Sequence, residues 1–271
     1  MESRGRGRPR SIFKESSAPT LQALDRALQV LGHLARSEAR TLTDISGALD
    51  IPAPTTHRIL TTLQNRGFAA FDEGTQTWAV GIEAYRTGSA YLRRTTLLDA
   101  ARPIMRRLME ATGETANLAV PDGIDVVSVG QVETPNPIRA FFNPGTRTAM
   151  HASGTGKAIL SALSVDQRAR LLSRMELYAF TEKTLNHRPL LEGDLEDTRA
   201  RGWSLEREER HLGMSCIGAA ITDARQEVVG AVSISGPSAR FTDERLLAFG
   251  AEVAKAAREI SIAIGDHSST D

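Results

Sequence analysis

The sequence has few of the features that assign a chain to a specialised class of protein. Its 271 residues include one cysteine, Cys216, which excludes an internal disulfide framework. It has no apolar run as long as a membrane span, and the basic N-terminus is not followed by the apolar core of a signal peptide. We therefore expect a cytoplasmic protein that does not partner a membrane.

The chain also has no formal net charge. The 33 Lys and Arg balance the 33 Asp and Glu, so the chain lacks the strong positive charge of a protein that coats nucleic acid. The distribution of charge is more informative, because Arg4, Arg6, Arg8, Arg10 and Lys14 crowd the N-terminal end. The length is sufficient for two domains, each with its own core.

The N-terminal tail, residues 1–19, combines Gly, Arg, Ser and Pro with almost nothing to bury, so we expect it to be disordered. Its Arg-Gly-Arg-Pro core resembles an AT-hook, in which Arg6 and Arg8 would lie in a narrow A·T-rich minor groove. The alternative is a solvated basic tail that adds only non-specific affinity. Both interpretations favour DNA as a partner.

Residues 41–80 carry the pattern on which the rest of the interpretation depends. Two short helices separated by a turn at Ile51-Pro52 precede a hairpin with a polar turn. Helix, turn, helix and hairpin in this order predict a unit that places a helix in the major groove of DNA. The expected elements are helices over 44–49 and 54–66 and strands over 68–71 and 77–80.

The second of these helices has two faces. Ile59, Leu60 and Leu63 share helical spacing with Thr56 and should pack inward. The other face is short, polar and basic, and its hydroxyl and guanidinium groups can bond to phosphates and base edges. The alternative is the solvated face of an ordinary helical hairpin. The residues expected to contact DNA, besides Arg6 and Arg8, are Thr43, Thr55, Thr56, His57, Arg58 and Thr62.

Two further helices flank this unit. Leu21, Leu24, Leu28 and Leu31 step by three and four residues and mark an apolar stripe that can cover the unit's core or pair with a second subunit. A helix from residue 82 to about residue 94 is expected to link two domains. The expected organisation is a basic tail over 1–19, a DNA-binding domain over 20–81, a linker helix over 82–95 and a second domain over 96–271.

The second half of the chain alternates strand pairs with helices. This order predicts a mostly antiparallel sheet with helices packed on it, so the fold class is α+β. The expected strands cover 115–120, 125–132, 138–143, 203–206, 216–222 and 228–235. The expected helices run from Thr96 to Gly113, near 154–163, after Ser164, over 190–201 and from Thr242 to the end.

Enzymatic motifs fail around the run Gly154-Thr155-Gly156-Lys157. A P-loop and a nucleophile elbow would both need glycine at the position of His151, and a dinucleotide fingerprint would need glycine at the position of Ile159. Cys216 with His151 or His211 is a conceivable nucleophile pair, yet a lone cysteine on an expected strand is more often a buried apolar residue. The histidines lack metal-binding spacing, so we expect neither metal nor cofactor.

A binding pocket fits the same residues better. Residues 152–156 lead into an expected helix, where unpaired N–H groups favour an anion and glycines let it approach. Ser233 and Ser235 are two apart on an expected strand, so both hydroxyls lie on one face. Amides and hydroxyls in a compact site suit a small carboxylate. The alternative is that these glycines serve only tight packing.

From about Thr20 to its end the chain resembles an IclR-family transcriptional regulator. Four segments carry the resemblance in the right order: HRILTTLQNRGF, MHASGTGKAILSAL, REERHLGMSCIGAAI and AVSISGPSARF. The resemblance implies an N-terminal winged helix-turn-helix, a linker helix and a C-terminal GAF-like effector-binding domain. It also implies homo-oligomers, namely dimers that often pair into homotetramers, bound to palindromic double-stranded operator DNA.

The resemblance also implies an effector site. Backbone amides of a glycine loop, a ligand-contacting cysteine, an acid and two serines have counterparts in this chain, and Met214 is expected in the apolar wall. Glu206 departs from the aspartate of similar members, and its extra methylene would narrow the pocket or change how a hydroxyl is held. The implied effector-binding residues are Gly154, Thr155, Glu206, Met214, Cys216, Ser233 and Ser235.

A second departure concerns DNA. Family members often carry a basic residue and a serine where this chain has Ala53 and Pro54, which shifts the expected base contacts to Thr55, His57 and Arg58.

A cysteine and two serines around a glycine loop resemble the members that sense glyoxylate or pyruvate, so glyoxylate is the first candidate effector. Aromatic-acid sensors of the same family are the alternative, and they would need more apolar lining than the sequence identifies. The alternative from another class is an enzyme that uses Cys216 on a small acid. In the regulator, effector binding would shift the arrangement of subunits and so the operator affinity.

Overall fold

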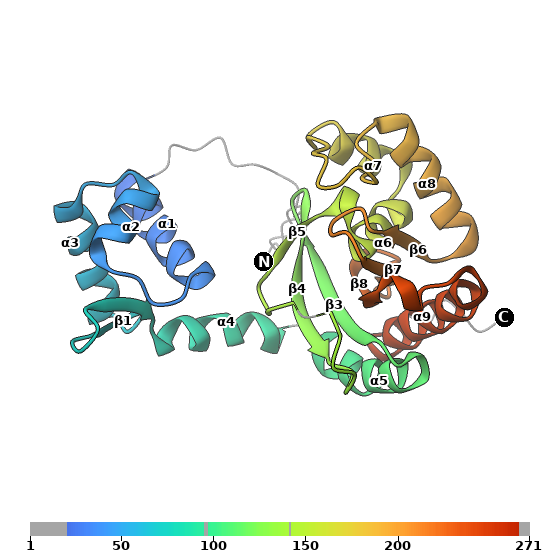
Figure 1. Cartoon of the computed structure of the whole chain (residues 1–271), viewed down its shortest axis with the longest axis horizontal. Helices are drawn as coiled ribbons and strands as arrows, with labels where there is room; N and C mark the ends of the chain where they lie inside the picture. Colours follow the sequence, from blue (N-terminus) through green and yellow to red (C-terminus); the bar gives the residue numbers. More distant parts are fainter. Residues whose placement is uncertain (1–20, 95–96, 141, 266–271) are drawn as a thin grey trace, which may run out of the picture. The chain divides into compact units, whose positions relative to one another are not determined.

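The computed structural model describes residues 21–94, 97–140 and 142–265, which form two compact units (Figure 1). The N-terminal unit is helical with a two-stranded hairpin, and the C-terminal unit combines a six-stranded sheet with helices. The expected α+β class, with a helix-turn-helix unit before a largely antiparallel one, is confirmed. Arg6, Arg8 and the rest of the tail lie outside the described residues.

The N-terminal unit has the expected helix, turn, helix and hairpin. Val30, Leu34, Ile45, Leu60 and Trp78 form its buried core. The hairpin strands pair antiparallel, and Trp78 packs against Phe71 across them with the two rings tilted by 42°. The elements are α1 (Gln22–Arg36), α2 (Leu42–Leu49), α3 (Ala53–Asn65), β1 (Ala69–Asp72), β2 (Thr77–Val80) and α4 (Ile82–Arg94).

Local chemistry fixes the ends of α2 and α3. Thr41 and Asp44 form a reciprocal capping box at the start of α2. Asp50 ends that helix in the left-handed conformation, with a φ of 51°. Pro52 precedes α3, where a proline also occupies the first turn. Gly67, with a φ of 75°, follows α3 and lets the chain turn into the hairpin.

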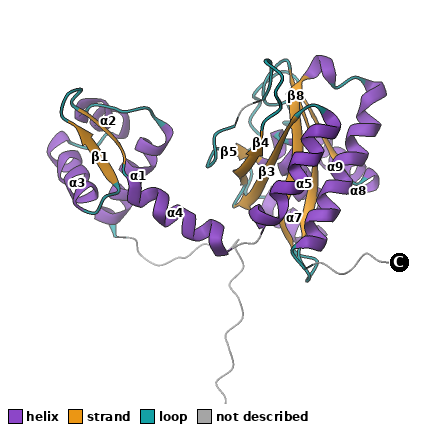
Figure 2. Cartoon of the chain, turned by 90° about the horizontal axis from the view of Figure 1, so that it is seen from below, coloured by secondary structure: helices purple, strands orange, loops and turns teal. Residues whose placement is uncertain are grey.

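The C-terminal unit is a six-stranded sheet with helices on both faces (Figure 2). The strand order is β5-β4-β3-β8-β7-β6, and every neighbouring pair is antiparallel. The strands are β3 (Thr115–Asp122), β4 (Asp125–Val132), β5 (Arg147–Ala149), β6 (Ser204–Arg207), β7 (Met214–Thr222) and β8 (Val228–Pro237). The helices are α5 (Leu97–Thr112), η1 (Met150–Ala152), α6 (Gly154–Ala162), α7 (Val165–Leu172), α8 (Arg188–Arg201), η2 (Ser238–Arg240) and α9 (Asp243–Ala263).

Successive residues of the central strands pack on opposite faces of the sheet. Leu118 and Val232, paired across β3 and β8, belong to the core under α5 and α9. The next pair, Ala119 and Ala231, belongs to the core that includes α6, α7 and α8. Because alanine is small, the α6 side of the sheet has room for a cavity.

Two expectations about strands are wrong. The segment 138–143 forms no strand in its described residues, and β5 at Arg147–Ala149 pairs with β4 at the sheet edge instead. Pro135, Pro137 and Pro144 flank that segment and lack the N–H that a ladder needs. The strand expected over 115–120 is also longer than predicted, since β3 continues to Asp122.

The contact between α9 and Trp203 yields a stability prediction. A β-carbon added at Gly250 would overlap the indole ring of Trp203, and both residues are buried. We expect Gly250→Ala to lower the free energy of unfolding by about 1–3 kcal/mol, because helix and ring must move apart. Gly193→Ala on the exposed side of α8, where a β-carbon meets open space, is the matched control and should raise it by up to about 1 kcal/mol. Urea unfolding measures both, and unchanged stability in Gly250→Ala would contradict the prediction.

Candidate functional site

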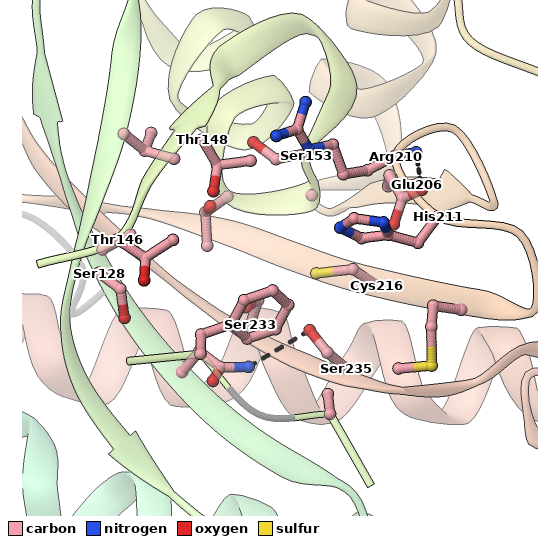
Figure 3. Close-up of a pocket in the computed structure, with 18 of the residues that line it drawn as sticks. Ser128, Thr146, Thr148, Ser153, Glu206, Arg210, His211, Cys216, Ser233 and Ser235 are labelled. Carbon is pink, nitrogen blue, oxygen red and sulfur yellow. Dashed lines mark hydrogen bonds between the residues drawn. The ribbon is translucent and has the colours of Figure 1, made fainter. Parts of the chain in front are cut away.

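The α6 side of the sheet holds a cavity of about 490 Å³ (Figure 3). Strands from across the sheet form its floor, and the turn that enters α6 borders it. The structure therefore brings together all seven residues expected to bind the effector, while what they bind stays a prediction. These residues are Gly154, Thr155, Glu206, Met214, Cys216, Ser233 and Ser235.

The strand register aligns the polar side chains of the cavity floor. Glu206 pairs with Cys216 across β6 and β7, and Cys216 pairs with Ser235 across β7 and β8. Ser233 pairs with Asn117 of β3, whose side-chain nitrogen donates a hydrogen bond of 3.2 Å to Ser235 Oγ. Because directly paired residues point to the same side of a sheet, these groups share the face that borders the cavity.

The start of α6 is held close against β7. A β-carbon at Gly218 would lie 2.6 Å from the carbonyl oxygen of Gly154, so glycine is required there. Ser204 donates a hydrogen bond of 2.6 Å to the same oxygen. Ser153 caps the helix by accepting a bond of 3.1 Å from the N–H of Gly156. The earlier N–H groups of Gly154 and Thr155 have no carbonyl partner one turn back in the helix and border the cavity, where that of Gly154 contacts the Cys216 thiol; such helix-start N–H groups favour an anion.

Cys216 lies in the middle of the floor as a protonated thiol. Burial raises its pKa to about 11, and the neighbouring Glu206 carboxylate acts in the same direction. The hydroxyls of Ser235 and Ser233 and the N–H of Gly154 oppose this shift of the pKa. At neutral pH the thiol is therefore a weak hydrogen-bond donor and a poor nucleophile.

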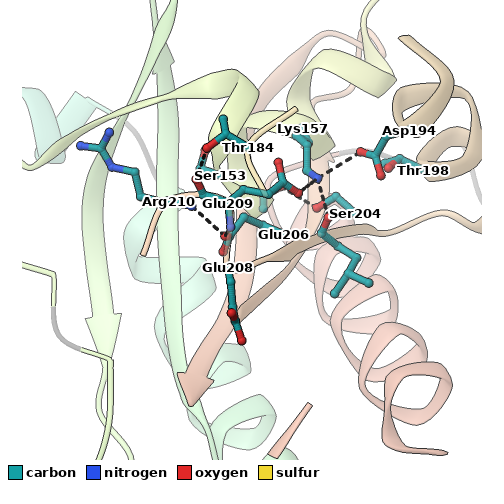
Figure 4. Close-up of polar contacts among 12 residues, drawn as sticks. Ser153, Lys157, Thr184, Asp194, Thr198, Ser204, Glu206, Glu208, Glu209 and Arg210 are labelled. Carbon is teal, nitrogen blue, oxygen red and sulfur yellow. Dashed lines mark hydrogen bonds and ion pairs between the residues drawn. The ribbon is translucent and has the colours of Figure 1, made fainter. Parts of the chain in front are cut away.

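Glu206 brings a carboxyl group to the cavity and is only 5% exposed. Burial raises its pKa to about 7, and the charge of Glu209 acts in the same direction. Against this, its Oε1 accepts hydrogen bonds from the backbone N–H of Glu209 at 2.6 Å and of Arg210 at 3.1 Å (Figure 4). Both protonation states are populated near neutral pH, so the carboxyl can donate to or accept from a ligand oxygen.

Lys157 does not line the cavity. It is fully buried, and its Nζ lies 2.5 Å from Glu209 Oε1 and 3.1 Å from Asp194 Oδ2 (Figure 4). It also donates to the carbonyl oxygen of Leu205. This ion cluster joins α6 to α8 and to the segment after β6. The lysine of the Gly-Thr-Gly-Lys run is thus engaged inside the protein, and a ligand phosphate has no access to it.

In the N-terminal unit, most residues expected to contact DNA are accessible. His57, Arg58 and Thr62 are exposed on α3, where Thr62 Oγ1 donates a bond of 2.7 Å to the Arg58 carbonyl oxygen. Thr55 is partly exposed at the start of the same helix, and Thr43 is exposed on α2. These five positions can meet DNA, although their contacts remain predictions.

Thr56 is a correction to that set. Its side chain is fully buried, and its hydroxyl donates a bond of 3.1 Å to the carbonyl oxygen of Ile51. Helical spacing places it on the inward face beside Leu60, where it ties α3 to the preceding turn. A DNA contact from Thr56 is therefore excluded in this fold.

The family follows from two matches that together span both units. The sequence pattern of the bacterial transcriptional regulator IclR C-terminal domain matches residues 89–262, and that of the IclR helix-turn-helix domain matches residues 23–73. The chain belongs to the IclR family. IclR-family proteins are transcriptional regulators and not enzymes. The alternative of an enzyme acting through Cys216 is accordingly set aside, in agreement with its protonated thiol.

Relatives of this IclR-family chain match it along nearly its whole length. The HTH-type transcriptional regulator BhcR of Paracoccus denitrificans is 48% identical over 262 residues, which cover 95% of this chain and 94% of the relative. The transcriptional repressor IclR of Escherichia coli is 41% identical over 263 residues, or 96% of each chain. The crystal structure of Thermotoga maritima IclR aligns with a TM-score of 0.73 and 26% identity, covering 89% of this chain and 98% of that one.

Two structural observations bear on partners of this IclR-family chain. Within the described residues, no helix is at once long enough and apolar enough to cross a bilayer. The same residues contain no group of three or more His, Cys, Asp or Glu side chains placed to hold a metal ion.

Sequence reasoning missed several groups that line the cavity. Asn117 lies within a run of residues predicted as a strand and was not singled out, although a buried amide among apolar residues is itself a signal of a polar site. Arg210 belongs to a charge-rich run typical of a solvated surface. Thr148 lies in β5 and Phe142 lies shortly before it, whereas the sequence predicted the strand of this region at 138–143. These residues come from distant segments that only the sheet register brings together.

The raised pKa of Glu206 gives a prediction about stability and pH. An acid whose pKa rises on folding from 4.5 to about 7 destabilises the folded state as pH increases through that interval, and costs nothing below it. We expect wild type to lose on the order of 3 kcal/mol of unfolding free energy from this group between pH 4.5 and pH 8. Glu206→Gln keeps an accepting oxygen for the two backbone N–H groups and should lose much less.

Urea unfolding at several pH values measures this difference, with the exposed Glu192→Gln as the matched control. A pH dependence in Glu206→Gln as steep as that of wild type would show that this carboxyl is not responsible.

Proposed function

We propose that this IclR-family chain binds double-stranded operator DNA through its N-terminal unit, and that a small carboxylate in the C-terminal cavity sets its operator affinity. Glyoxylate, or a related 2-oxo acid such as pyruvate, is the first candidate effector. The observation that carries the proposal is the cavity itself, where helix-start amides, a protonated thiol and two serine hydroxyls converge. As a regulator of genes it would act in the cytoplasm, where operator DNA lies.

A 2-oxo acid matches the two kinds of polar group in the cavity. Its carboxylate is suited to the N–H groups of Gly154 and Thr155, which offer partial positive charge at the start of α6. Its oxo oxygen, or a hydrate hydroxyl, is suited to Ser233 and Ser235. The carboxyl of Glu206 can donate to this oxygen when it is protonated, which avoids repulsion between two negative charges.

An aromatic acid is the second candidate, and the cavity walls favour it more than the sequence suggested. Ala119, Val126, Ala140, Phe142 and Met214 supply apolar lining beside the polar floor. A volume of about 490 Å³ also exceeds what a two-carbon acid fills. The titration described below therefore includes a benzoate-type acid.

The regulator is proposed to act as a homo-oligomer, a dimer or a dimer of dimers, as family membership implies. Leu21, which caps α1, and Leu24 and Leu28 within it are 75%, 56% and 59% exposed, and this apolar stripe suits pairing with a second copy. Residues 82–95 would link the two domains and transmit the effector's influence to paired recognition helices. Effector binding shifts such an equilibrium only by its differential affinity for the two arrangements.

The effector assignment is tested by calorimetric titration with glyoxylate, pyruvate and a benzoate-type acid. We expect saturable glyoxylate binding, weakened about tenfold in Ser233→Ala because one hydroxyl partner in the cavity is lost. Ser173→Ala, an exposed serine after α7, is the matched control and should bind as wild type does. Heat with the aromatic acid alone would overturn the choice of glyoxylate and keep the regulator.

The DNA-binding assignment is tested at Arg58. We expect Arg58→Ala to weaken binding to the operator fragment by about 1–3 kcal/mol, because an exposed guanidinium on α3 is lost from the interface. Fluorescence anisotropy with labelled DNA measures the affinity, and effector affinity in the C-terminal unit should stay unchanged. If both affinities fell together, misfolding would be the explanation and the assigned role of Arg58 would lose its support.

A further inference from the structure

The cavity is built with more space and more polar groups than a two-carbon acid uses. Its volume of about 490 Å³ lies in the range of sites that hold considerably larger ligands. The groups assigned above to a 2-oxo acid all lie at the start of α6 and on β6, β7 and β8. The remainder of the lining, toward β4 and β5, has no role in that assignment.

That remainder carries hydroxyls that no described side chain or backbone group engages. Thr146 and Thr148 are two apart at and before β5, so they share one face, and both line the cavity. Neither hydroxyl has a hydrogen-bond partner in the part of the chain that the structure describes. Figure 3 shows both on the side of the cavity away from Cys216 and Glu206, in keeping with the three strands between β5 and β7.

Arg210 supplies a positive charge to this part of the cavity. It follows β6, and its side chain extends away from Glu206 toward the strands β4 and β5 (Figure 4). Its guanidinium carbon lies 3.8 Å from the centre of the Phe180 ring, which itself stacks on His151 at 5.7 Å. The aromatic ring holds the guanidinium in place by a cation–π contact without neutralising its charge.

The two arginines that line the cavity, Arg139 and Arg210, differ in whether they form an ion pair. Arg139 Nε lies 2.7 Å from the Glu133 carboxylate, whereas no described Asp or Glu forms a salt bridge with Arg210. A guanidinium fixed at a cavity wall, with its charge uncompensated, is suited to bind a carboxylate through its planar fork of N–H donors. The first carboxylate of an effector is already provided for at the start of α6.

We propose that Arg210, with Thr148 and Thr146 of the same cavity, forms a second carboxylate subsite, and that the preferred effector is a small dicarboxylate of about four or five carbons. This inference rests on the proposed function, because it assumes that the first carboxylate binds at the start of α6. Arg210 is then the residue that determines specificity for a doubly charged acid over a singly charged one.

The test is a calorimetric titration of the full chain with malate and glutarate, each beside its isosteric half-amide (malamate and glutaramate), and with glyoxylate. The half-amide keeps the shape and removes only the distal charge. We expect wild type to bind at least one dicarboxylate about tenfold or more tightly than its half-amide, as a charged hydrogen bond implies. Arg210→Met, which keeps an apolar stem over Phe180, should abolish this preference.

Arg139→Met is the matched control, since this arginine also lines the cavity but is paired with Glu133, and it should keep the preference. Equal binding of each dicarboxylate and its half-amide by wild type, or a preference that persists in Arg210→Met, would overturn the subsite. Glyoxylate should bind Arg210→Met as it binds wild type. If wild type does not bind glyoxylate but shows an Arg210-dependent preference for a dicarboxylate over its half-amide, the subsite is supported and glyoxylate is overturned as the effector. No binding of any of these acids would overturn both.

Discussion

The arrangement of the cavity depends on a charge that cannot reach water. Lys157 is fully buried in α6, and a buried ammonium is tolerated only when carboxylates and carbonyl groups surround it. Glu209 and Asp194 meet this requirement, so the segment after β6 must stay against α6. Arg210 belongs to that segment, and Glu206 of β6 accepts hydrogen bonds from its backbone N–H groups; both residues line the cavity. The buried ion pair therefore helps to fix the positions of Glu206, which can exchange a proton, and of Arg210, whose side chain extends away from it.

The same constraint connects the cavity to the rest of the C-terminal unit. Under the proposed function, an anion at the start of α6 would touch the helix that carries Lys157, and a ligand oxygen at Glu206 would touch a residue bonded to the N–H of Glu209. Asp194 extends the ion cluster into α8. A bound ligand would thus act on α6, the segment after β6 and α8 together, because separating any of them would leave a buried charge without its partner.

The sequence was sufficient for the parts of the fold that local rules decide. Capping residues, glycine ends and alternating patterns located the helix-turn-helix and most strands, because each depends on a few neighbouring residues. Around 138–143, prolines that lack an N–H outweigh the strand propensity of the other residues. Thr56 was predicted to contact DNA, but its hydroxyl forms a buried hydrogen bond in the core instead. Of the cavity, Gly154 and Ser233 were predicted from the residue pattern, and Cys216 was predicted through family resemblance. Asn117 and Arg210 were not predicted. Asn117 is positioned by pairing between distant strands, and Arg210 is held by a contact with Phe180.

The charge balance of the cavity bears on what an effector can accomplish there. When Glu206 is ionised, its negative charge repels an anion that approaches the start of α6. Protonation of Glu206 removes the repulsion, so binding of an anion favours the protonated carboxyl and takes up a proton near neutral pH. Glu206 is buried and pairs with Cys216 across β6 and β7, and its burial raises the pKa of its carboxyl group. Under the proposed function, the affinity for an acid therefore depends on pH as well as on the shape of the acid.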